Sequence, residues 1–125
     1  MGLNLISVCI GGLLGVLIRY SLIQGLQQIH FTTRTLIANS LGCLVLGIII
    51  AIIQQVDIPE HVRMGVIIGC CGALTTFSSI IYDIITLLSQ EQFTQAVYYF
   101  LLTNIAGIAM FGFGFVISTF LYKQL

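Results

Sequence analysis

Apolar residues occupy four long stretches of the chain, and short polar segments separate them. The stretches cover residues 3–27, 35–54, 60–89 and 96–122. Each is long enough to supply the roughly 20 apolar residues with which a helix crosses the hydrocarbon core of a bilayer. The pattern predicts an all-α membrane protein, a single integral membrane domain over residues 1–125 with four transmembrane helices. With four crossings, both termini lie on the same side.

The third stretch is interrupted by a segment that suits a continuous helix poorly. Residues 69–83 read G-C-C-G-A-L-T-T-F-S-S-I-I-Y-D, in which a Gly-Ala segment is followed by four hydroxyl residues. Either half of the stretch is too short to cross the bilayer alone. Unpaired backbone groups cost several kcal/mol each in lipid, so a break persists only where it faces a cavity, an ion or protein. We predict a helix broken near residues 72–76 and a functional site at the break.

Composition places this chain among membrane proteins and excludes several functions. Hydrophobic residues make up 58% and charged residues only 6%, against about 25% charged in soluble domains, so most of the surface faces lipid. Four basic residues balance four acidic ones, which gives no basic surface for nucleic acid. We expect no enzymatic activity, because no nucleophile, base and orienting group occur together. The four cysteines are interpreted as small, inert, buried residues.

Polar residues within the apolar stretches mark candidate functional positions. Arg19 lies inside the first stretch, where a cation either extends to the membrane surface or lines a water-filled space. Thr35, Asn39 and Cys43 share one face of the second helix at a spacing of four residues. Asn39 either lines a pathway or bonds a neighbouring helix. Gly11, Gly12 and Gly15 form a G-x-x-x-G face suited to close helix packing.

The polar groups at membrane depth are mostly neutral hydrogen-bond donors. Such donors can replace the hydration of a small anion without trapping it, and conduction requires both entry and exit. The ring edge of Phe77 carries partial positive charge and is a weak anion partner, although packing is the commoner role of a single phenylalanine. Carbonyls freed at the break can coordinate a cation such as Na⁺, or the break is a simple kink in which Thr75 or Thr76 caps the second half-helix.

Three segments carry a resemblance to a known family. They are G-G-L-L-G-V-L-I-R-Y at residues 11–20, T-L-I-A-N-S-L-G at residues 35–42 and G-C-C-G-A-L-T-T-F-S-S at residues 69–79. In order, spacing and number of spans the chain resembles the Fluc (CrcB) family of bacterial fluoride channels. The resemblance implies an antiparallel dual-topology dimer with fluoride pathways along the subunit interface.

The resemblance also implies roles for individual residues. Backbone carbonyls of Gly72 and Thr75 would hold one structural Na⁺ at the two-fold axis. Asn39 corresponds to the pore amide, Arg19 to the vestibule arginine and Phe77 to the first of two pore phenylalanines. The expected ion-pathway residues are Arg19, Thr35 at the pore mouth, Asn39, Thr76, Phe77, Ser78, Ser79 and Ile80.

The chain departs from the family pattern at positions that bear on conduction. Ile80 stands where the family has its second phenylalanine, and Asp83 where it has a glutamate. Gly107 and Phe111 occupy positions where the fourth helix of the family carries a polar row. The departures bring the number of conducting pathways into question. A homodimer and a heterodimer with a homologous chain are both open.

The resulting hypothesis is a passive fluoride channel of the bacterial cytoplasmic membrane that lowers internal fluoride and gives fluoride resistance. One alternative is a small dual-topology multidrug or cation exporter, which would need a carboxylate at membrane depth. Asp83 is the only such candidate. Another alternative is a non-conducting partner subunit of a heterodimeric fluoride channel.

Overall fold

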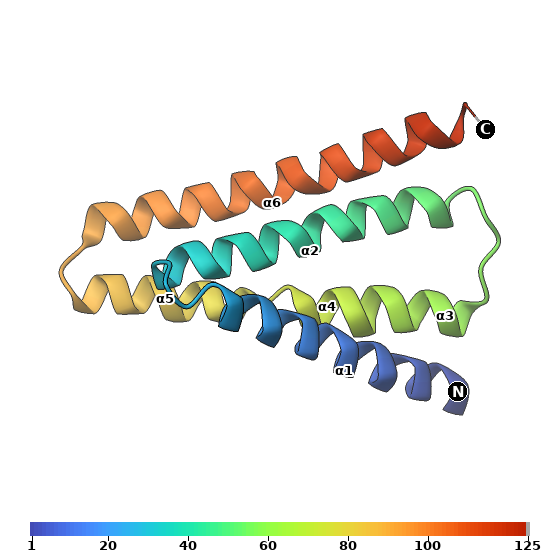
Figure 1. Ribbon diagram of the computed structural model, residues 1–125, viewed down its shortest axis with the longest axis horizontal. Helices are drawn as coiled ribbons and strands as arrows, with labels where there is room; N and C mark the ends of the chain where they lie inside the picture. Colours follow the sequence, from blue (N-terminus) through green and yellow to red (C-terminus); the bar gives the residue numbers. More distant parts are fainter. Residues whose placement is uncertain (125) are drawn as a thin grey trace.

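The helices are arranged in two packed pairs, as Figure 1 shows for the computed structural model, which describes residues 1–124. Helix α1 (Gly2–Gly25) packs on the third span, and α2 (Phe31–Ile53) packs on α6 (Phe93–Tyr122). The third span is divided into four parts, namely α3 (Glu60–Met64), the π-helical segment η1 (Gly65–Cys71), α4 (Gly72–Leu74) and α5 (Phe77–Ser89). Residues 1–124 contain no strand. The prediction of an all-α chain with four spans and a broken third helix is confirmed.

The two ends of the chain lie at the same end of the bundle (Figure 1), as four crossings require. The start of α2 differs from the prediction, because residues 31–34 form its first turn and not part of a polar loop. Polar residues are tolerated there, since the first N–H groups of a helix have no partner within it. Helix α6 likewise begins at Phe93, three residues before its predicted start at Ala96.

Glycines bring α1 into backbone contact with the third span. Gly11 and Gly15 are buried, and a Cβ added to either would overlap a backbone carbonyl, that of Gly65 or Cys70 respectively. Nothing lies within 4 Å of the corresponding position on Gly12. Close packing of the G-x-x-x-G face is therefore confirmed for Gly11 and Gly15. The backbone of Gly12 also lies close to the third span, since a Cβ on Gly69 would be 2.9 Å from the Gly12 nitrogen, but a side chain on Gly12 would point into open space. The contact fixes the position of the third span along the axis of α1.

The pair formed by α2 and α6 is joined in the same way. A Cβ on Gly47 would meet the carbonyl of Phe111, and a Cβ on Gly114 would meet that of Leu44. Gly112 faces open space. Close contact along these helices leaves little room between them near the chain ends. Space opens further along, beside the break in the third span.

Candidate functional site

The break in the third span lies at Thr75 and Thr76. Both residues are extended, with φ −94° and ψ 136° at Thr75 and φ −141° and ψ 110° at Thr76. Gly72 is still helical, so the chain leaves the helix at the end of the predicted 72–76 segment. The Thr75 amide and hydroxyl both donate to the Cys71 carbonyl, at 3.0 and 2.9 Å. These two bonds close the first half of the helix.

The side chain of Asn39 holds the break against α2. Its Oδ1 accepts a hydrogen bond from the Thr76 amide at 2.9 Å, and its Nδ2 donates to the Thr76 carbonyl at 3.4 Å. In an unbroken helix the Thr76 amide would donate to the Gly72 carbonyl. Thr76 occupies the N-cap position of α5, but its side chain makes no capping bond. The prediction that a threonine hydroxyl caps this half-helix is wrong, because the Thr75 hydroxyl donates to the Cys71 carbonyl and the Thr76 hydroxyl makes no capping bond.

Arg19 reaches inward to the same place. Its Nη1 donates to the Leu74 carbonyl at 2.8 Å and to Asn39 Oδ1 at 3.1 Å. The last carbonyls of a helix carry partial negative charge, which a guanidinium stabilises. The side chain is therefore directed to the break and does not extend to the membrane surface. A positive charge and a neutral amide stand next to each other at the point where the helix ends.

A groove of about 310 Å³, called here the central groove, lies beside the break. Its lining residues come from α2, the break and α6 and are Asn39, Cys43, Thr75, Thr76, Phe77, Ile80, Thr103, Asn104, Gly107 and Ile108. Four of the eight predicted ion-pathway residues are among them. Arg19 reaches the groove through its bond to Asn39. Thr35 is buried one turn before Asn39, while Ser78 and Ser79 lie outside the lining set.

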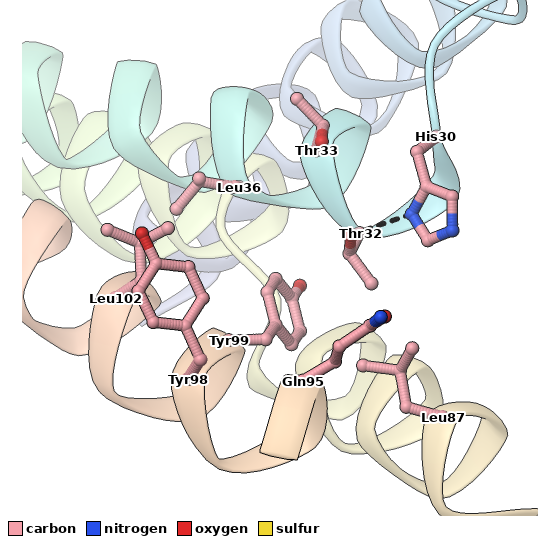
Figure 2. Close-up of a pocket in the computed structure, with 9 residues that line it drawn as sticks. All are labelled: His30, Thr32, Thr33, Leu36, Leu87, Gln95, Tyr98, Tyr99 and Leu102. Atoms are coloured by element: carbon pink, nitrogen blue, oxygen red, sulfur yellow. Dashed lines mark hydrogen bonds between the residues drawn. The ribbon is translucent and has the colours of Figure 1, made fainter. Parts of the chain in front are cut away.

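A second space, of about 320 Å³, lies where α2 and α6 begin, and is called here the loop-end pocket. It is lined by His30, Thr32, Thr33, Leu36, Leu87, Gln95, Tyr98, Tyr99 and Leu102. Figure 2 shows side chains from the start of α2 lying across from those of the first turns of α6, with His30 Nδ1 hydrogen-bonded to Thr32 Oγ1 at 2.9 Å. The lining carries four hydroxyl groups and one side-chain amide, together with three leucines.

Tyr99 has a role that sequence reasoning missed. Its hydroxyl donates to Asp83 Oδ2 at 3.0 Å, and the two residues are only 5% and 4% exposed. Tyr99 is therefore turned into the protein, whereas its neighbour Tyr98 is exposed. A carboxylate at membrane depth requires a donor. The presence of Asp83 in an apolar stretch therefore indicated a hydrogen-bond donor nearby, but the sequence did not identify which residue would donate.

Removing the Tyr99 hydroxyl should destabilise the protein. Tyr99→Phe leaves the Asp83 carboxyl buried without this donor, so we expect the free energy of unfolding to fall by about 1–3 kcal/mol. Thermal unfolding in detergent measures the change. The matched control is Tyr98→Phe, which removes the same hydroxyl from an exposed neighbour. Equal unfolding temperatures for the two variants would contradict the expectation.

Comparison with known proteins assigns the family. The model described as "CrcB-like protein, Camphor Resistance (CrcB)" matches residues 6–115. The chain belongs to the CrcB family. One CrcB relative, from Desulfotalea psychrophila, is 33% identical over 118 residues, which is 93% of this chain and 92% of the relative. Another, from Methanococcus vannielii, is 36% identical over 113 residues, or 88% and 91% of the two chains.

A third CrcB relative, from Stutzerimonas stutzeri, is 38% identical over 97 residues, covering 74% of this chain and 78% of the relative. All three relatives are named fluoride-specific ion channel FluC. The family resemblance seen in the three sequence segments is thereby confirmed. The CrcB family is a family of ion channels and not of enzymes.

Proposed function

We propose that this chain forms a passive, fluoride-selective channel. The observation that carries the proposal is the central groove, where a broken helix, a buried amide and a guanidinium meet. Fluoride is proposed as the conducted ion because the CrcB relatives are named fluoride-specific ion channels. Conduction needs a lining that replaces water around the ion and still releases it. Neutral hydrogen-bond donors beside Arg19, whose guanidinium is already hydrogen-bonded to protein, meet that need better than a row of cations without partners.

Each part of the groove has a task in this mechanism. Asn39 Nδ2 has two hydrogens and gives one to the Thr76 carbonyl, so the other is available to an anion. Arg19 supplies positive charge beside that amide and favours entry of an anion. Phe77, which is 62% exposed, presents its ring at the groove, where the positive ring edge can contact the ion.

The direction of flow follows from the chemistry of fluoride. Hydrogen fluoride crosses membranes as a neutral acid and ionises inside the cell. A membrane potential, which is worth about 2.3 kcal/mol per charge per 100 mV, then drives the anion outward through an open channel. The proposal places this multi-pass protein in the bacterial cytoplasmic membrane, where it would lower internal fluoride and give fluoride resistance.

A second chain should cover the open side of the groove. Phe77, Ser78 and Asn104 are exposed in the single chain, although they lie in membrane-spanning helices. Polar groups facing lipid are unfavourable, so a protein surface is a better neighbour for Ser78 and Asn104 than hydrocarbon. We propose an antiparallel dual-topology dimer of this chain. A heterodimer with a homologous chain is the alternative that the functional experiment distinguishes.

The proposal includes a structural Na⁺ held by carbonyls of Gly72 and Thr75. The residues fit such an ion, because the Thr76 amide donates its hydrogen bond to Asn39. In an unbroken helix it would donate to the Gly72 carbonyl, which thus lacks this donor. Gly72 is exposed, and the nearest atom to an added Cβ would be 3.7 Å away, which leaves access from a partner chain. A bound cation would neutralise the negative ends of two half-helices where two copies cross.

Fluoride efflux from liposomes tests the channel. Purified protein is reconstituted with fluoride inside, a potassium gradient is set, and efflux is followed with a fluoride electrode after valinomycin is added. We expect rapid fluoride efflux without a proton gradient and much slower chloride efflux, with protein-free liposomes as the control. Efflux only when a homologous chain is present would indicate a heterodimer. Equal fluoride and chloride efflux would refute the proposal.

A further inference from the structure

Arg34 is a cation near the edge of the membrane whose Nε lacks an acceptor. It lies in the first turn of α2, and its Nε is buried and makes no hydrogen bond within residues 1–124. Arg19, by contrast, donates to two protein oxygens. Residues 24–33, which precede Arg34, contain no carboxylate. A buried donor without an acceptor is unfavourable, so this guanidinium calls for a negatively charged partner from outside the chain.

An apolar groove, called here the lateral groove, begins beside Arg34 and lies between α1 and α2. Its volume is about 680 Å³, and it is lined from Leu17 to Leu26 on α1 and by Ile37 and Leu41 on α2. Ile37 and Leu41 follow Arg34 by three and seven residues, so the three side chains share one face of α2. Arg34 therefore stands at the end of the groove that is nearer to the membrane surface.

The lateral groove has the length of one leaflet of the bilayer. From Leu17 to Leu26 there are nine helical steps of 1.5 Å, or roughly 14 Å. One leaflet contributes about 15 Å to the hydrocarbon core. The groove ends where α1 and α2 are joined, at the end of the bundle opposite the chain termini (Figure 1). An acyl chain that enters from the membrane surface would fill this length.

The walls of the groove suit a flexible chain better than another helix. Six of its eight lining residues are leucine or isoleucine, and the other two are Ser21 and Gly25. Membrane helices that pack closely present small residues to each other, as α1 does to the third span through Gly11 and Gly15. Branched side chains along most of the groove keep a second backbone at a distance and leave a channel between them.

We propose that the lateral groove and Arg34 form a binding site for one phospholipid with a net negative headgroup, such as phosphatidylglycerol. One acyl chain lies in the groove, and the phosphate accepts hydrogen bonds from the guanidinium, whose paired N–H donors match phosphate oxygens. The positive end of the α2 dipole favours the same charge. The site shares no lining residue with the central groove, so it is separate from the proposed ion pathway.

Substitution of Arg34 tests the headgroup contact. Purified protein in detergent is titrated with dioleoyl phosphatidylglycerol, and native mass spectrometry measures the bound fraction. We expect Arg34→Gln to weaken binding about tenfold, since charge-assisted hydrogen bonds are lost. Arg34→Lys keeps the charge without the paired donors and should bind with intermediate affinity.

Arg63→Gln is the matched control for the loss of charge. Arg63 also borders an apolar groove, but that groove measures only about 170 Å³ and lies at the other end of the bundle. Its substitution should leave the affinity unchanged within about twofold. Unchanged binding in Arg34→Gln, or an equal loss in Arg34→Gln and Arg63→Gln, would overturn the site.

Gly25→Phe tests the groove without altering charge. Nothing lies within 4 Å of a Cβ added to Gly25, so the ring can occupy the groove without disturbing the packing of α1. We expect binding of dioleoyl phosphatidylglycerol to weaken about tenfold, because the acyl chain loses its place. Gly112→Phe is the control, since it adds the same ring to a glycine that faces open space outside the groove.

Two further measurements identify the occupant of the groove. Dihexanoyl phosphatidylglycerol has the same headgroup on short chains, and it should bind at least about tenfold more weakly than the dioleoyl lipid. Equal affinity would show that the phosphate alone is recognised and would overturn the role of the groove. If Gly25→Phe converted dimers to monomers in size-exclusion chromatography, a second copy of the chain would occupy the groove, and the lipid site would be refuted.

Discussion

Asn39→Leu is expected to abolish fluoride efflux and to lower the stability of the folded protein. Asn39 is the partner of the Thr76 amide, the Thr76 carbonyl and the Arg19 guanidinium. Leucine satisfies none of them. At membrane depth no water would replace Asn39 as the partner of the amide and the carbonyl, and the part-buried Arg19 guanidinium would lose one of its acceptors.

Efflux and thermal unfolding measure the two effects of Asn39→Leu separately. We expect efflux to fall at least about hundredfold, since the break loses its position and the pore loses its donor. The free energy of unfolding should fall by about 3 kcal/mol or more, because several polar groups lose their partner at once. For stability the matched control is Asn104→Leu, since the Asn104 amide bonds only a carbonyl of its own helix, that of Phe100 at 2.6 Å. An Asn39→Leu protein that unfolds no earlier than Asn104→Leu would show that the break is held by other contacts.

Gly11→Ala and Gly15→Ala are expected to reduce the yield of folded protein, whereas Gly12→Ala is expected to behave as the wild type. The methyl group at either of the first two positions would overlap a backbone carbonyl of η1. Backbone cannot move aside as a flexible side chain can, so α1 must separate from the third span. Overpacking of this kind is unfavourable by about 1–3 kcal/mol, occasionally more.

The three glycines form an internally matched set. They lie on one helix within two turns, so differences in helix propensity and membrane insertion cancel among the three alanine variants. Size-exclusion profiles and thermal unfolding in detergent measure the outcome, and fluoride efflux should fall in parallel, because α1 also carries Arg19 to the break. If Gly12→Ala were as damaging as Gly11→Ala, the backbone crossing would not be the cause.

Much of the fold could be predicted because the bilayer limits the choices. Lengths of the apolar stretches indicated four spans, and the Gly-Ala-Thr-Thr segment indicated the break. The spacing of Thr35, Asn39 and Cys43 placed them on one face, and in the structure Asn39 and Cys43 both line the groove. Such inferences use only the geometry of a single helix. They fail where two helices must be positioned relative to each other.

Several contacts of the site depend on how two helices are positioned relative to each other. The sequence allowed Arg19 to point outward or inward, and only the position of the Leu74 carbonyl decides. Thr75 and Thr76 were equally suited to cap α5, but neither hydroxyl does so, and the break is held instead by Asn39 of α2, which accepts a hydrogen bond from the Thr76 amide. Tyr98 and Tyr99 are adjacent and chemically identical, and the rotation of α6 puts only Tyr99 within reach of Asp83. Each outcome depends on tertiary packing, which periodicity does not encode.

The two ends of the chain share one end of the bundle, and this restricts how two copies could be joined genetically. A tandem fusion with a short water-soluble linker would insert both halves the same way up. An antiparallel pair on one polypeptide would require the linker itself to cross the bilayer an odd number of times.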